Sequence, residues 1–469
     1  MTAVNASKKF EKMVPPTKPI ARALTIAGSD SGGGAGIQAD LKTFAALRVH
    51  GMSAITAVTA QNTTEVRAVH DIPIDVIKAQ VEAVVADVGV DAAKTGMLHT
   101  TEIIRTVTEE LKRHHFPIVV DPVMIAKSGV KLLQDSAINS LKEYLVPIAT
   151  VITPNAMEAE ALAQMKIRSL DNARQAAKRI SELGARAVIV KGGHVPTGGR
   201  VVDTLYFEND FQEFQAPYVE RDTDHGTGCS FSAAITAEIA KGSSIPDAVA
   251  VARQLISSAI RHGIRVGKGH GPLNPLSLLY REAEKNEVLN DLNRAILLLE
   301  ESRSFPRLIP ESQTNIGMSL QDPESLMDIA AVPGRIVKAG EHAKASAPPR
   351  FGASKHVAST IFTVMQFDPS KRAAINIRHD PKLAEACERL GLTSSSYDRS
   401  LEPEDVKRRE GGTIPWGTEQ AIRNVGKVPD VIYHLGDFGK EPMAVILSKS
   451  AYQVARTALE IAEILKGQE

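Results

Sequence analysis

The chain is poor in cysteine and aromatic residues and has no excess of either charge. Cys229 and Cys387 are the only cysteines among 469 residues, which excludes a disulfide framework and predicts a reducing, cytoplasmic compartment. Basic and acidic residues balance at 55 each. This argues against a nucleic-acid partner, because nucleic acids select a basic face. No run of about 18 apolar residues occurs, so no membrane span is expected.

What remains is the composition of an ordinary globular chain. Hydrophobic residues make up 43% and charged residues 23%, as in folded domains generally. A length of 469 residues exceeds one ordinary domain and predicts two or three. Residues 1–20 mix Lys, Glu, Asn and Pro without an apolar stretch of signal-peptide length, and they are expected to form a disordered tail.

From Arg22 to about residue 264, short β-branched runs alternate with helical patterns. Strands are expected over 23–27, 54–60, 117–120, 151–153 and 185–191, with a hairpin of 204–207 and 211–216. Helices are expected over 36–47 and 75–87, and beginning near 155, 227 and 246. The alternation predicts an α/β sheet covered on both faces. Ligands of such sheets bind at the carboxyl ends of strands.

A second α/β region follows a segment rich in Gly, Pro and His at 267–275. Helical patterns over 276–301 and Pro- and Ser-rich stretches to 315 place a domain boundary near residue 285. Beyond it, strands are expected over 360–367, 373–377, 431–434 and 443–447, and helices over 382–390 and 452–466.

A glycine-rich segment, Ala27 to Gly36, follows the first expected strand and opens the first helix. Such a loop lets the backbone approach a ligand and aims N–H groups at it. A plain tight turn is the alternative. The segment is not a Walker A loop, because no Gly-Lys-Ser/Thr ends it.

The segment His225-Gly226-Thr227-Gly228-Cys229 stands at the start of a helix. Free N–H groups there form an anion hole suited to a transferring phosphoryl group. The helix dipole is expected to lower the pKa of the Cys229 thiol, which could then accept a proton from an attacking hydroxyl. The alternative, a small buried cysteine, applies to Cys387 inside an ordinary helix.

Two further motifs follow expected strands. Asn155 and Glu158 lie one helical turn apart and offer hard oxygens suited to Mg²⁺; a helix cap is the alternative for Asn155. At the end of the strand over 185–191 stand Lys191, Gly193 and His194. They suit nucleotide phosphates, and a simple turn is the alternative.

Together these motifs resemble the hydroxymethylpyrimidine and hydroxymethylpyrimidine-phosphate kinases of the ribokinase-like superfamily. The resemblance covers about residues 20–275, in blocks at 23–44, 51–63, 96–98, 120–129, 153–158, 191–194 and 225–229. It implies a ribokinase-like three-layer α/β sandwich that uses ATP and Mg²⁺.

The resemblance also implies roles for individual residues. The pyrimidine pocket would use Gly28, Asp40, Gln61, Met97 and Val123, and Gln61 offers the donor and acceptor that suit an aminopyrimidine edge. A flap at 126–129, with Lys127, would cover the phosphates. Lys191, Gly193 and Thr227 would bind ATP, Asp121 would join Asn155 and Glu158 near the metal, and Cys229 would be the base beside Gly226 and Gly228.

The second region carries charged residues embedded among glycines and aromatics. They occur at 334–336, 349–356, 376–379, 396–399, 411–417 and 436–442, a pattern more typical of a pocket than of a solvated face. The blocks resemble the ThiN-type thiamine-phosphate synthase domain over about 290–469. This implies a smaller α/β domain that joins hydroxymethylpyrimidine diphosphate to a thiazole phosphate and releases diphosphate.

Such a reaction needs cations around the leaving diphosphate. Arg335, Lys355, His356 and Arg378 are the candidates, and Arg335 and His356 match polar positions of the family's active site. Arg399 and Asp437 are further candidates for substrate binding. An ion pair with Asp380 or Asp398 is the alternative for Arg378 and Arg399, and Trp416 could stack on a ring or belong to the core.

The expected organisation is a kinase over 21–275, a linker over 276–289 and a synthase over 290–469. The expected partners are small-molecule substrates and a second copy of the chain, since dimers are common among ribokinase-like proteins. Two other hypotheses stay open. The second domain could be a regulatory module that binds thiamine phosphate, or the first could be a pyridoxal-type kinase.

Overall fold

The computed structural model describes residues 19–124, 132–133, 135–193, 198–437 and 439–466. The chain divides into two compact units, Met1–Leu279 and Tyr280–Glu469. The expected tail, except for its last two residues, lies outside the described residues. So do Lys127 with the expected flap, and His194.

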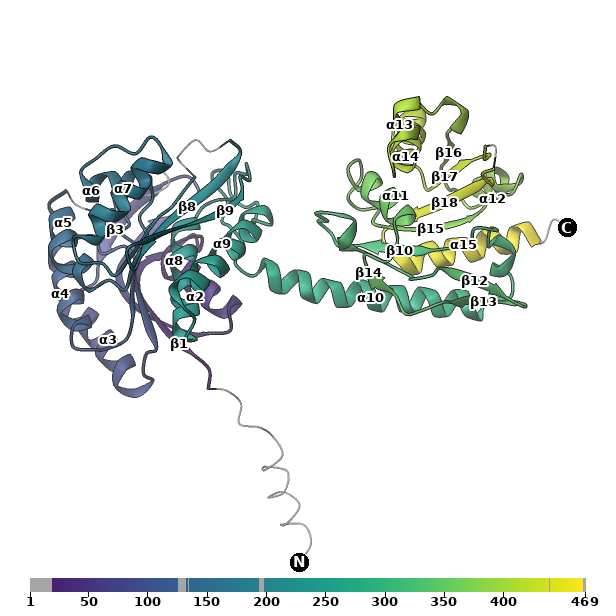
Figure 1. Cartoon of the computed structure of the whole chain (residues 1–469). Helices are drawn as coiled ribbons and strands as arrows, with labels where there is room; N and C mark the ends of the chain where they lie inside the picture. Colours follow the sequence, from purple (N-terminus) through teal and green to yellow (C-terminus); the bar gives the residue numbers. More distant parts are fainter. Residues whose placement is uncertain (1–18, 125–131, 134, 194–197, 438, 467–469) are drawn as a thin grey trace, which may run out of the picture. The chain divides into compact units, whose positions relative to one another are not determined.

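The first unit is built on a nine-stranded mixed sheet (Figure 1). Its strands are β1 (Arg22–Asp30), β2 (His50–Gln61), β3 (Val66–Asp71), β4 (Ala92–Thr95), β5 (Ile118–Val120), β6 (Val151–Ile152), β7 (Ala187–Val190), β8 (Arg200–Phe207) and β9 (Asp210–Pro217). Their spatial order is β3-β2-β1-β4-β5-β6-β7-β8-β9. Strands β2, β1, β4, β5, β6 and β7 run parallel to one another. Strand β3 at one edge is antiparallel to β2, and the β8–β9 hairpin forms the antiparallel part of the other edge.

Helices cover both faces of this sheet (Figure 1). One face carries α3 (Ile74–Asp87), α4 (Thr101–Leu111), α5 (Asp135–Ser140), α6 (Ala156–Ala163) and α7 (Leu170–Ser181); the other carries α2 (Gly36–Ala46), α8 (Thr227–Ala240) and α9 (Ile245–Arg261). Because side chains alternate along a strand, Val188 and Val190 pack with the first set, whereas Ala187 and Ile189 pack with the second. The predicted three-layer sandwich is confirmed.

The second unit contains a seven-stranded sheet and a separate hairpin. The sheet has the order β14 (Arg350–Phe351), β11 (Ile329–Ala331), β10 (Ile316–Ser319), β15 (Ala373–Arg378), β18 (Met443–Ser448), β17 (Val431–His434) and β16 (Ser394–Ser396). The hairpin pairs β12 (Ile336–Ala339) with β13 (His342–Ala345). Only β16 and β17 pair in parallel in this sheet; its other pairs are antiparallel.

This second sheet is also covered on both faces. One core is formed with α10 (Ser277–Glu301), α12 (Leu383–Arg389) and α15 (Ala451–Lys466), the other with α11 (His356–Met365) and α14 (Thr413–Val425). Along β15, Ile375 faces the first core and Ala374 the second. A short helix, α13 (Glu404–Arg408), precedes α14. The predicted second α/β domain is therefore confirmed.

The segment expected as a linker, 276–289, is almost entirely helical as the first half of α10. From Val288 onward, α10 buries Val288, Leu292 and Leu299 in the core of the second unit. Among the described residues, no helix has both the length and the apolar character needed to cross a bilayer.

Several short strands and helices, among them β3, β4 and α4, were not predicted, and one element was predicted with the wrong secondary structure. The β-branched run over 360–367 predicted a strand, but it forms most of helix α11. Val357, Ile361 and Val364 recur at helical spacing and fill one buried face. The hydroxyl of Ser359 donates to the carbonyl of Lys355 one turn earlier, at 2.7 Å. Packing against the sheet therefore overrides the strand propensity of these residues.

The position of α11 can be tested through Ile361, which is fully buried. Ile361→Ala should lower the free energy of unfolding of the second unit by about 2–5 kcal/mol, because it leaves a cavity between α11 and the sheet. Trp416, the only tryptophan, lies in this unit, so its fluorescence during urea unfolding reports the loss. Val425→Ala, at an exposed position on α14, is the control; equal effects of the two substitutions would contradict the packing.

Candidate active sites

Polar side chains of the first unit gather where its parallel strands end. Asp30 and Gln61 are the last residues of β1 and β2, Asp121 follows β5, and Lys191 follows β7. The carboxyl ends of parallel strands lie along one edge of a sheet, where open α/β folds bind ligands. The topology thus brings most of the predicted kinase residues to one edge.

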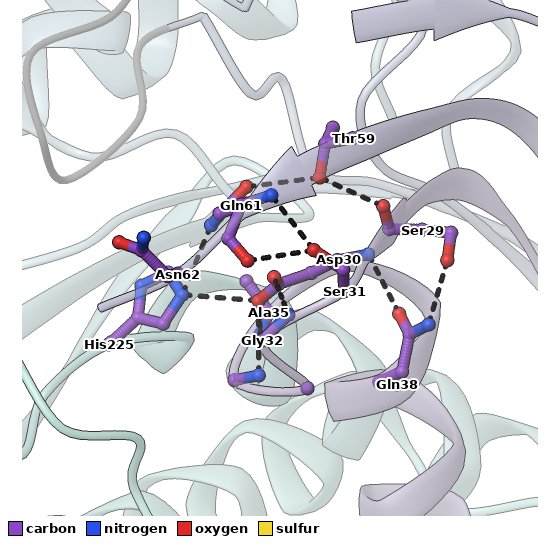
Figure 2. Close-up of polar contacts among 12 residues, drawn as sticks. Ser29, Asp30, Ser31, Gly32, Ala35, Gln38, Thr59, Gln61, Asn62 and His225 are labelled. Carbon is purple, nitrogen blue, oxygen red and sulfur yellow. Dashed lines mark hydrogen bonds and ion pairs between the residues drawn. The ribbon is translucent and has the colours of Figure 1, made fainter. Parts of the chain in front are cut away.

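Asp30 organises the glycine-rich loop (Figure 2). Its carboxylate accepts hydrogen bonds from the N–H groups of Gly32 (2.8 Å), Gly34 (3.0 Å) and Ala35 (2.8 Å). Burial alone would raise the pKa of Asp30, but hydrogen bonds from His225 and from the loop hold that pKa below its ordinary value. The ionised carboxylate therefore fixes the conformation of the glycine-rich loop.

His225 joins this loop to Gln61 (Figure 2). Its Nε2 atom lies 3.2 Å from Oδ2 of Asp30 and 3.3 Å from Nε2 of Gln61. Because an ionised carboxylate only accepts hydrogen bonds, the Nε2 proton belongs toward Asp30, so the Gln61 amide nitrogen, itself a donor, only lies in contact with Nε2. The backbone of Gln61 is also held by the Ser31 hydroxyl, which donates to its carbonyl and accepts from its N–H, at 2.7 and 2.8 Å. The amide expected to read the pyrimidine is thus anchored on the loop network.

Two glycines bring the start of α8 against the loop and against Lys191. A Cβ atom on Gly226, whose φ is +86°, would lie 1.9 Å from the Gly34 carbonyl oxygen. A Cβ atom on Gly228 would lie 3.2 Å from Nζ of Lys191. N–H groups in the first turn of a helix lack intrahelical partners and favour anions. The close approach therefore supports the predicted anion hole.

Cys229 lies in the first turn of α8, and its sulfur accepts a hydrogen bond from the N–H of Gly36. Burial raises the pKa of the thiol to about 12; Lys94 acts in the opposite direction, and Asp40 and Asp121 add to the rise. The lowered pKa predicted from the helix dipole is therefore wrong in direction. Desolvation and two nearby carboxylates outweigh the partial charge of a helix end.

Asp40 and Lys94 form a fully buried ion pair near Cys229. Nζ of Lys94 lies 2.8 Å from Oδ2 of Asp40, and both side chains are 0% exposed. The hydroxyl of Thr25 donates to the same oxygen at 2.6 Å. Oδ1 of Asp40 has no hydrogen-bond partner among the described residues. A buried oxygen without a donor is costly, so a donor on a ligand would relieve it, in line with the predicted substrate contact.

The apolar members of the predicted pyrimidine pocket lie together. Met97 packs with Ala57 and Leu132, and Val123 lies against this cluster. A Cβ atom on Gly28 would come within 3.1 Å of the Met97 sulfur, so glycine leaves room for the thioether. An apolar wall beside a few fixed polar groups is the usual setting of a ring-binding pocket.

Asp121, Lys191 and Glu158 form a second charged group. Nζ of Lys191 lies 3.2 Å from Oδ1 of Asp121, and the Ser232 hydroxyl donates to Oδ2 of Asp121 at 3.2 Å. Burial raises the pKa of Glu158 to about 7; Lys191 lowers it and Asp121 raises it. Two buried carboxylates therefore share one lysine.

Asn155 and Glu158 also form the capping box of α6. Oδ1 of Asn155 accepts the N–H of Glu158 at 2.9 Å, and Oε2 of Glu158 accepts the N–H of Asn155 at 2.8 Å. The helix cap that was the alternative for Asn155 is thus present. The box engages one oxygen of each residue, so Asp121 and Glu158 are stronger candidates for a metal than Asn155 only because they are carboxylates.

Asp121 and Glu158 suit an Mg²⁺ ion whose remaining ligands come mainly from the nucleotide. The part of the chain that is described gathers no three or more His, Cys, Asp or Glu side chains suited to a metal ion. Mg²⁺ is commonly bound by one or two carboxylates together with nucleotide phosphates and water. A cation would also relieve the crowding that raises the pKa of Glu158.

The other predicted nucleotide residues are exposed or engaged locally. Gly193 has a φ of +90°, with no atom within 4 Å of a Cβ built on it. The hydroxyl of Thr227 donates to the carbonyl of Asp224 at 2.6 Å. Their contacts with ATP stay predictions.

The second unit repeats the arrangement at strand ends. Strands β11, β15, β16 and β17 run in one direction, so their carboxyl ends lie on one edge of the sheet. Arg335 follows β11, Arg378 ends β15, Tyr397 follows β16 and His434 ends β17. The separated blocks of polar residues therefore converge on one edge.

Basic groups surround His356, the first residue of α11. Partial burial of the ring lowers the pKa of His356, and the charges of Arg335, Lys440 and Lys355 add to this. Arg335 adopts a φ of +72°, and its guanidinium donates to the carbonyl of Ser312. We call Arg335, Lys355, His356 and Lys440 the basic cluster. Arg335, Lys355 and Lys440 supply the positive charge that a diphosphate requires, although Lys355 also pairs with Glu410 at 3.4 Å, and His356 supplies a neutral donor.

A buried asparagine fixes the strand that leads to Arg335. Asn315 accepts the N–H of Val332 through Oδ1 and donates through Nδ2 to its carbonyl, both at 3.0 Å. Oδ1 of Asn376, in β15, accepts the N–H of Asn315 at 2.7 Å. Three neighbouring strands are thus locked together at the site edge.

The ion pairs that were the alternative for Arg378 and Arg399 are not found within 4 Å among the described residues. Asp398 instead accepts the N–H of Ser400 at 2.8 Å. Asp437 pairs through its backbone with Lys440. Trp416 is partly buried and meets the ring of Tyr397 edge-on, with centroids 6.0 Å apart.

Some residues in these sites were not singled out from the sequence. Asp30, Lys94 and His225 belong to the first site, and Lys440 and His434 to the second. Asp30 and His225 lie inside motifs that were recognised, so their polarity at a strand or helix end was the available signal. Lys94 lies in a short buried strand, where a lysine is unusual.

Two family models match the chain. Residues 30–274 match the model described as phosphomethylpyrimidine kinase, and residues 291–460 match the model described as thiamine-phosphate synthase ThiN. The first match follows the unit with the Cys229 site, and the second follows the unit with the basic cluster.

Curated relatives agree with the first match. The hydroxymethylpyrimidine/phosphomethylpyrimidine kinase of Bacillus subtilis is 49% identical over 256 residues, 54% of this chain and 94% of the relative. The thiamine biosynthesis bifunctional protein ThiED of Geobacter sulfurreducens is 45% identical over 257 residues, 55% of this chain and 52% of that protein.

Solved structures resemble the first unit. The pyridoxal kinase of Bacillus subtilis, in an ADP complex, has 39% identity and a TM-score of 0.52, covering 55% of this chain and 99% of that one. The pyridoxal kinase of Staphylococcus aureus with AMP-PCP and pyridoxal has 36% identity and the same TM-score, covering 56% and 95%. With the first model spanning just over half of the residues, the chain belongs to the phosphomethylpyrimidine kinase family and carries a ThiN thiamine-phosphate synthase domain behind it.

Proposed function

We propose that one chain carries out three consecutive steps of thiamine biosynthesis, two phosphorylations and one coupling. The first unit transfers phosphoryl groups from ATP to hydroxymethylpyrimidine and then to its monophosphate. The second unit joins the resulting diphosphate to thiazole phosphate. The observation that carries the proposal is the meeting of Cys229, Lys191 and Asp121 with the start of α8 at one sheet edge, together with the basic cluster in the second unit.

In the kinase step, the substrate oxygen attacks the γ-phosphorus and the bond to the bridging oxygen of ADP breaks. Catalysis rests on positioning and charge stabilisation. The N–H groups at the start of α8 and the Lys191 ammonium face developing negative charge on the phosphoryl oxygens. Cys229, in its thiolate form, accepts the hydroxyl proton; Lys94 favours that form and burial opposes it. Mg²⁺ near Asp121 and Glu158 would neutralise phosphate charge when bound.

The acceptor is proposed to be the pyrimidine rather than pyridoxal. Solved relatives named for pyridoxal share 36–39% identity with the chain, whereas curated relatives named for the pyrimidine reach 43–49%. Gln61, anchored beside the Met97 wall, presents a donor and an acceptor together, as an aminopyrimidine edge requires. Comparing kcat/KM for the two acceptors distinguishes the alternatives.

In the synthase step, the bond between the pyrimidine methylene and the diphosphate oxygen breaks, and the thiazole nitrogen bonds to that carbon. The electron pair leaves with diphosphate, so the site must stabilise negative charge on oxygen. Arg335, Lys355, His356 and Lys440 are placed to do so.

The proposal as a whole is tested by one assay on the full chain, in the cytoplasmic, reducing conditions that we expect. Hydroxymethylpyrimidine, ATP, Mg²⁺ and thiazole phosphate are supplied, and thiamine phosphate is followed by chromatography. Diphosphorylated pyrimidine without thiamine phosphate would make the second unit a sensor instead. Light scattering on the same sample tests the expected homodimer.

Replacing the thiol tests the proposed base. Cys229→Ala should lower kinase kcat by roughly 10²–10⁴-fold, the usual contribution of acid–base catalysis. The wild-type rate should rise with pH above neutrality, since the thiolate fraction grows toward a pKa of about 12, and the variant should lose this rise. ADP release measures both. Cys387→Ala, buried in α12, is the control, and a Cys229→Ala enzyme within threefold of wild type would exclude the role.

The raised pKa of Glu158 makes a prediction about stability. A carboxyl whose folded pKa lies above its unfolded value stabilises the fold below about pH 4.5 and loses this as pH rises through about 7. Glu158→Gln keeps the capping box and should therefore be more stable than wild type at pH 8, by on the order of 1–3 kcal/mol, but not at pH 4. Thermal unfolding without nucleotide measures it.

Glu160→Gln, on the same helix, provides a control of opposite sign. Hydrogen bonds from Ile167 and Lys166 lower the pKa of Glu160. This variant should therefore be less stable than wild type at pH 8, and the difference should shrink at pH 4. If both substitutions shift stability in the same direction, electrostatics at Glu158 are not the cause.

The synthase residues can be tested without disturbing the kinase. Arg335→Gln and His356→Gln should each lower thiamine-phosphate formation by roughly 10²–10³-fold, the cost of losing one preorganised charge stabiliser. ADP release by the same preparations should be unchanged. Arg456→Gln, which removes an exposed ion pair on α15, is the matched control. Synthase activity near wild type in both site variants would place the chemistry elsewhere.

A further inference from the structure

The synthase reaction brings two anionic substrates together. The pyrimidine carries a diphosphate on its reacting carbon, and the thiazole carries a phosphate ester remote from its reacting nitrogen. Like charges repel strongly in a poorly hydrated site. The second unit must therefore hold the two anions at separate places, and the basic cluster accounts for one of them.

A second polar group lies at the carboxyl ends of β16 and β17. Tyr397 and His434 meet there with ring centroids 5.2 Å apart. The Tyr397 ring also packs on the backbone of Gly417 in α14, where a Cβ atom would lie 2.3 Å from Cε2 of the tyrosine. The two rings thus form a fixed aromatic corner, as a bound heteroaromatic ring would require.

His434 presents one free donor in this corner. Its Nδ1 atom accepts the N–H of Gly436 at 3.1 Å, which assigns the proton of the neutral ring to Nε2. Burial lowers the pKa of His434 to about 4, and the charges of Arg399 and His379 act in the same direction. The imidazole is therefore neutral at pH 7, with Nε2–H available.

Arg399 supplies the cation. Its Nε atom is buried and has no hydrogen-bond partner within the described part of the chain. Its charge lowers the pKa of His434, and its charge and a side-chain hydrogen bond to Tyr397 oppose the rise that burial causes in the pKa of Tyr397. A guanidinium with a buried free N–H is suited to bind phosphate.

The acidic residues around Arg399 do not neutralise it by direct pairing. Asp398 is engaged with the N–H of Ser400. Glu402 is nearly buried, forms no ion pair within 4 Å of Arg399 among the described residues, and leaves its Oε1 atom without a partner. The buried Nε–H of Arg399 therefore still lacks an acceptor, and an anion would supply one.

We propose that Arg399 and Nε2–H of His434 bind the phosphate ester of the thiazole substrate, apart from the basic cluster that binds the diphosphate. One guanidinium and one neutral donor suit a monoester, whereas the larger charge of a diphosphate suits the four-membered cluster. The inference rests on the proposed synthase function and names the place of its second substrate.

The test compares thiazole phosphate with the unphosphorylated thiazole alcohol, using the full chain and supplied pyrimidine diphosphate. Wild-type protein should prefer the phosphate. Arg399→Gln should reduce the ratio of kcat/KM values, phosphate over alcohol, by roughly 10- to 100-fold, the usual loss for a hydrogen bond to a charged group. The KM for pyrimidine diphosphate should stay near wild type. Arg423→Gln, an exposed arginine on α14, is the matched control.

A structural role for Arg399 would not change the preference between two thiazoles. If kcat/KM falls equally for both, the proposal is overturned. His434→Gln keeps an amide nitrogen near the place of Nε2 and should retain most of the preference, whereas His434→Asn places it near Nδ1 and should lose it. Equal behaviour of these two variants would also contradict the proposal.

Calorimetry separates this inference from the proposed function. If the wild-type chain makes no thiamine phosphate, the catalytic proposal fails. Binding of thiazole phosphate and of its alcohol to wild type and Arg399→Gln is then measured directly. A preference for the phosphate that the variant lacks would uphold the anion site, and equal affinities would refute it.

Discussion

Both sheets are covered by helices on their two faces, and this constraint decides where chemistry can occur. Side chains along strands such as β7 and β15 are buried on either side, so polar groups can reach a ligand only where a strand ends. Asp30, Gln61, Asp121 and Lys191 in the first unit obey this rule, as do Arg335, Arg378 and His434 in the second. Two chemically different reactions therefore both use the strand-end edge of a helix-covered sheet.

The charged groups of the first unit show the energetic cost of that arrangement. Lys94, 0% exposed, is compensated by Asp40, and Lys191 by Asp121 and Glu158. Removing one partner of a buried pair typically costs about 3–5 kcal/mol because it leaves an isolated charge. These lysines therefore serve the fold as well as the phosphate groups that the site is proposed to receive.

The sequence was informative where one local signal dominates. Most strands of the first sheet follow from periodicity, although the short β3 and β4 were not predicted. The helix cap considered as the alternative for Asn155 follows from residue type, and both families were recognisable from separated motifs. It failed where tertiary packing decides. The β-branched run at 360–367 becomes α11 because Val357, Ile361 and Val364 share a buried face. The pKa of Cys229 rises because distant residues desolvate the thiol, and no local pattern shows that His434 and Tyr397 meet.

The continuous helix α10 passes from the last residues of the first unit into the core of the second. Each polypeptide that is translated thus carries one site of each kind, and neither can be made without the other. The balance between supply and use of the pyrimidine diphosphate is then set by two turnover numbers and is independent of gene dosage. A mutation that slows one unit cannot be offset by expressing that unit more, so selection must act on the two catalytic rates as a pair.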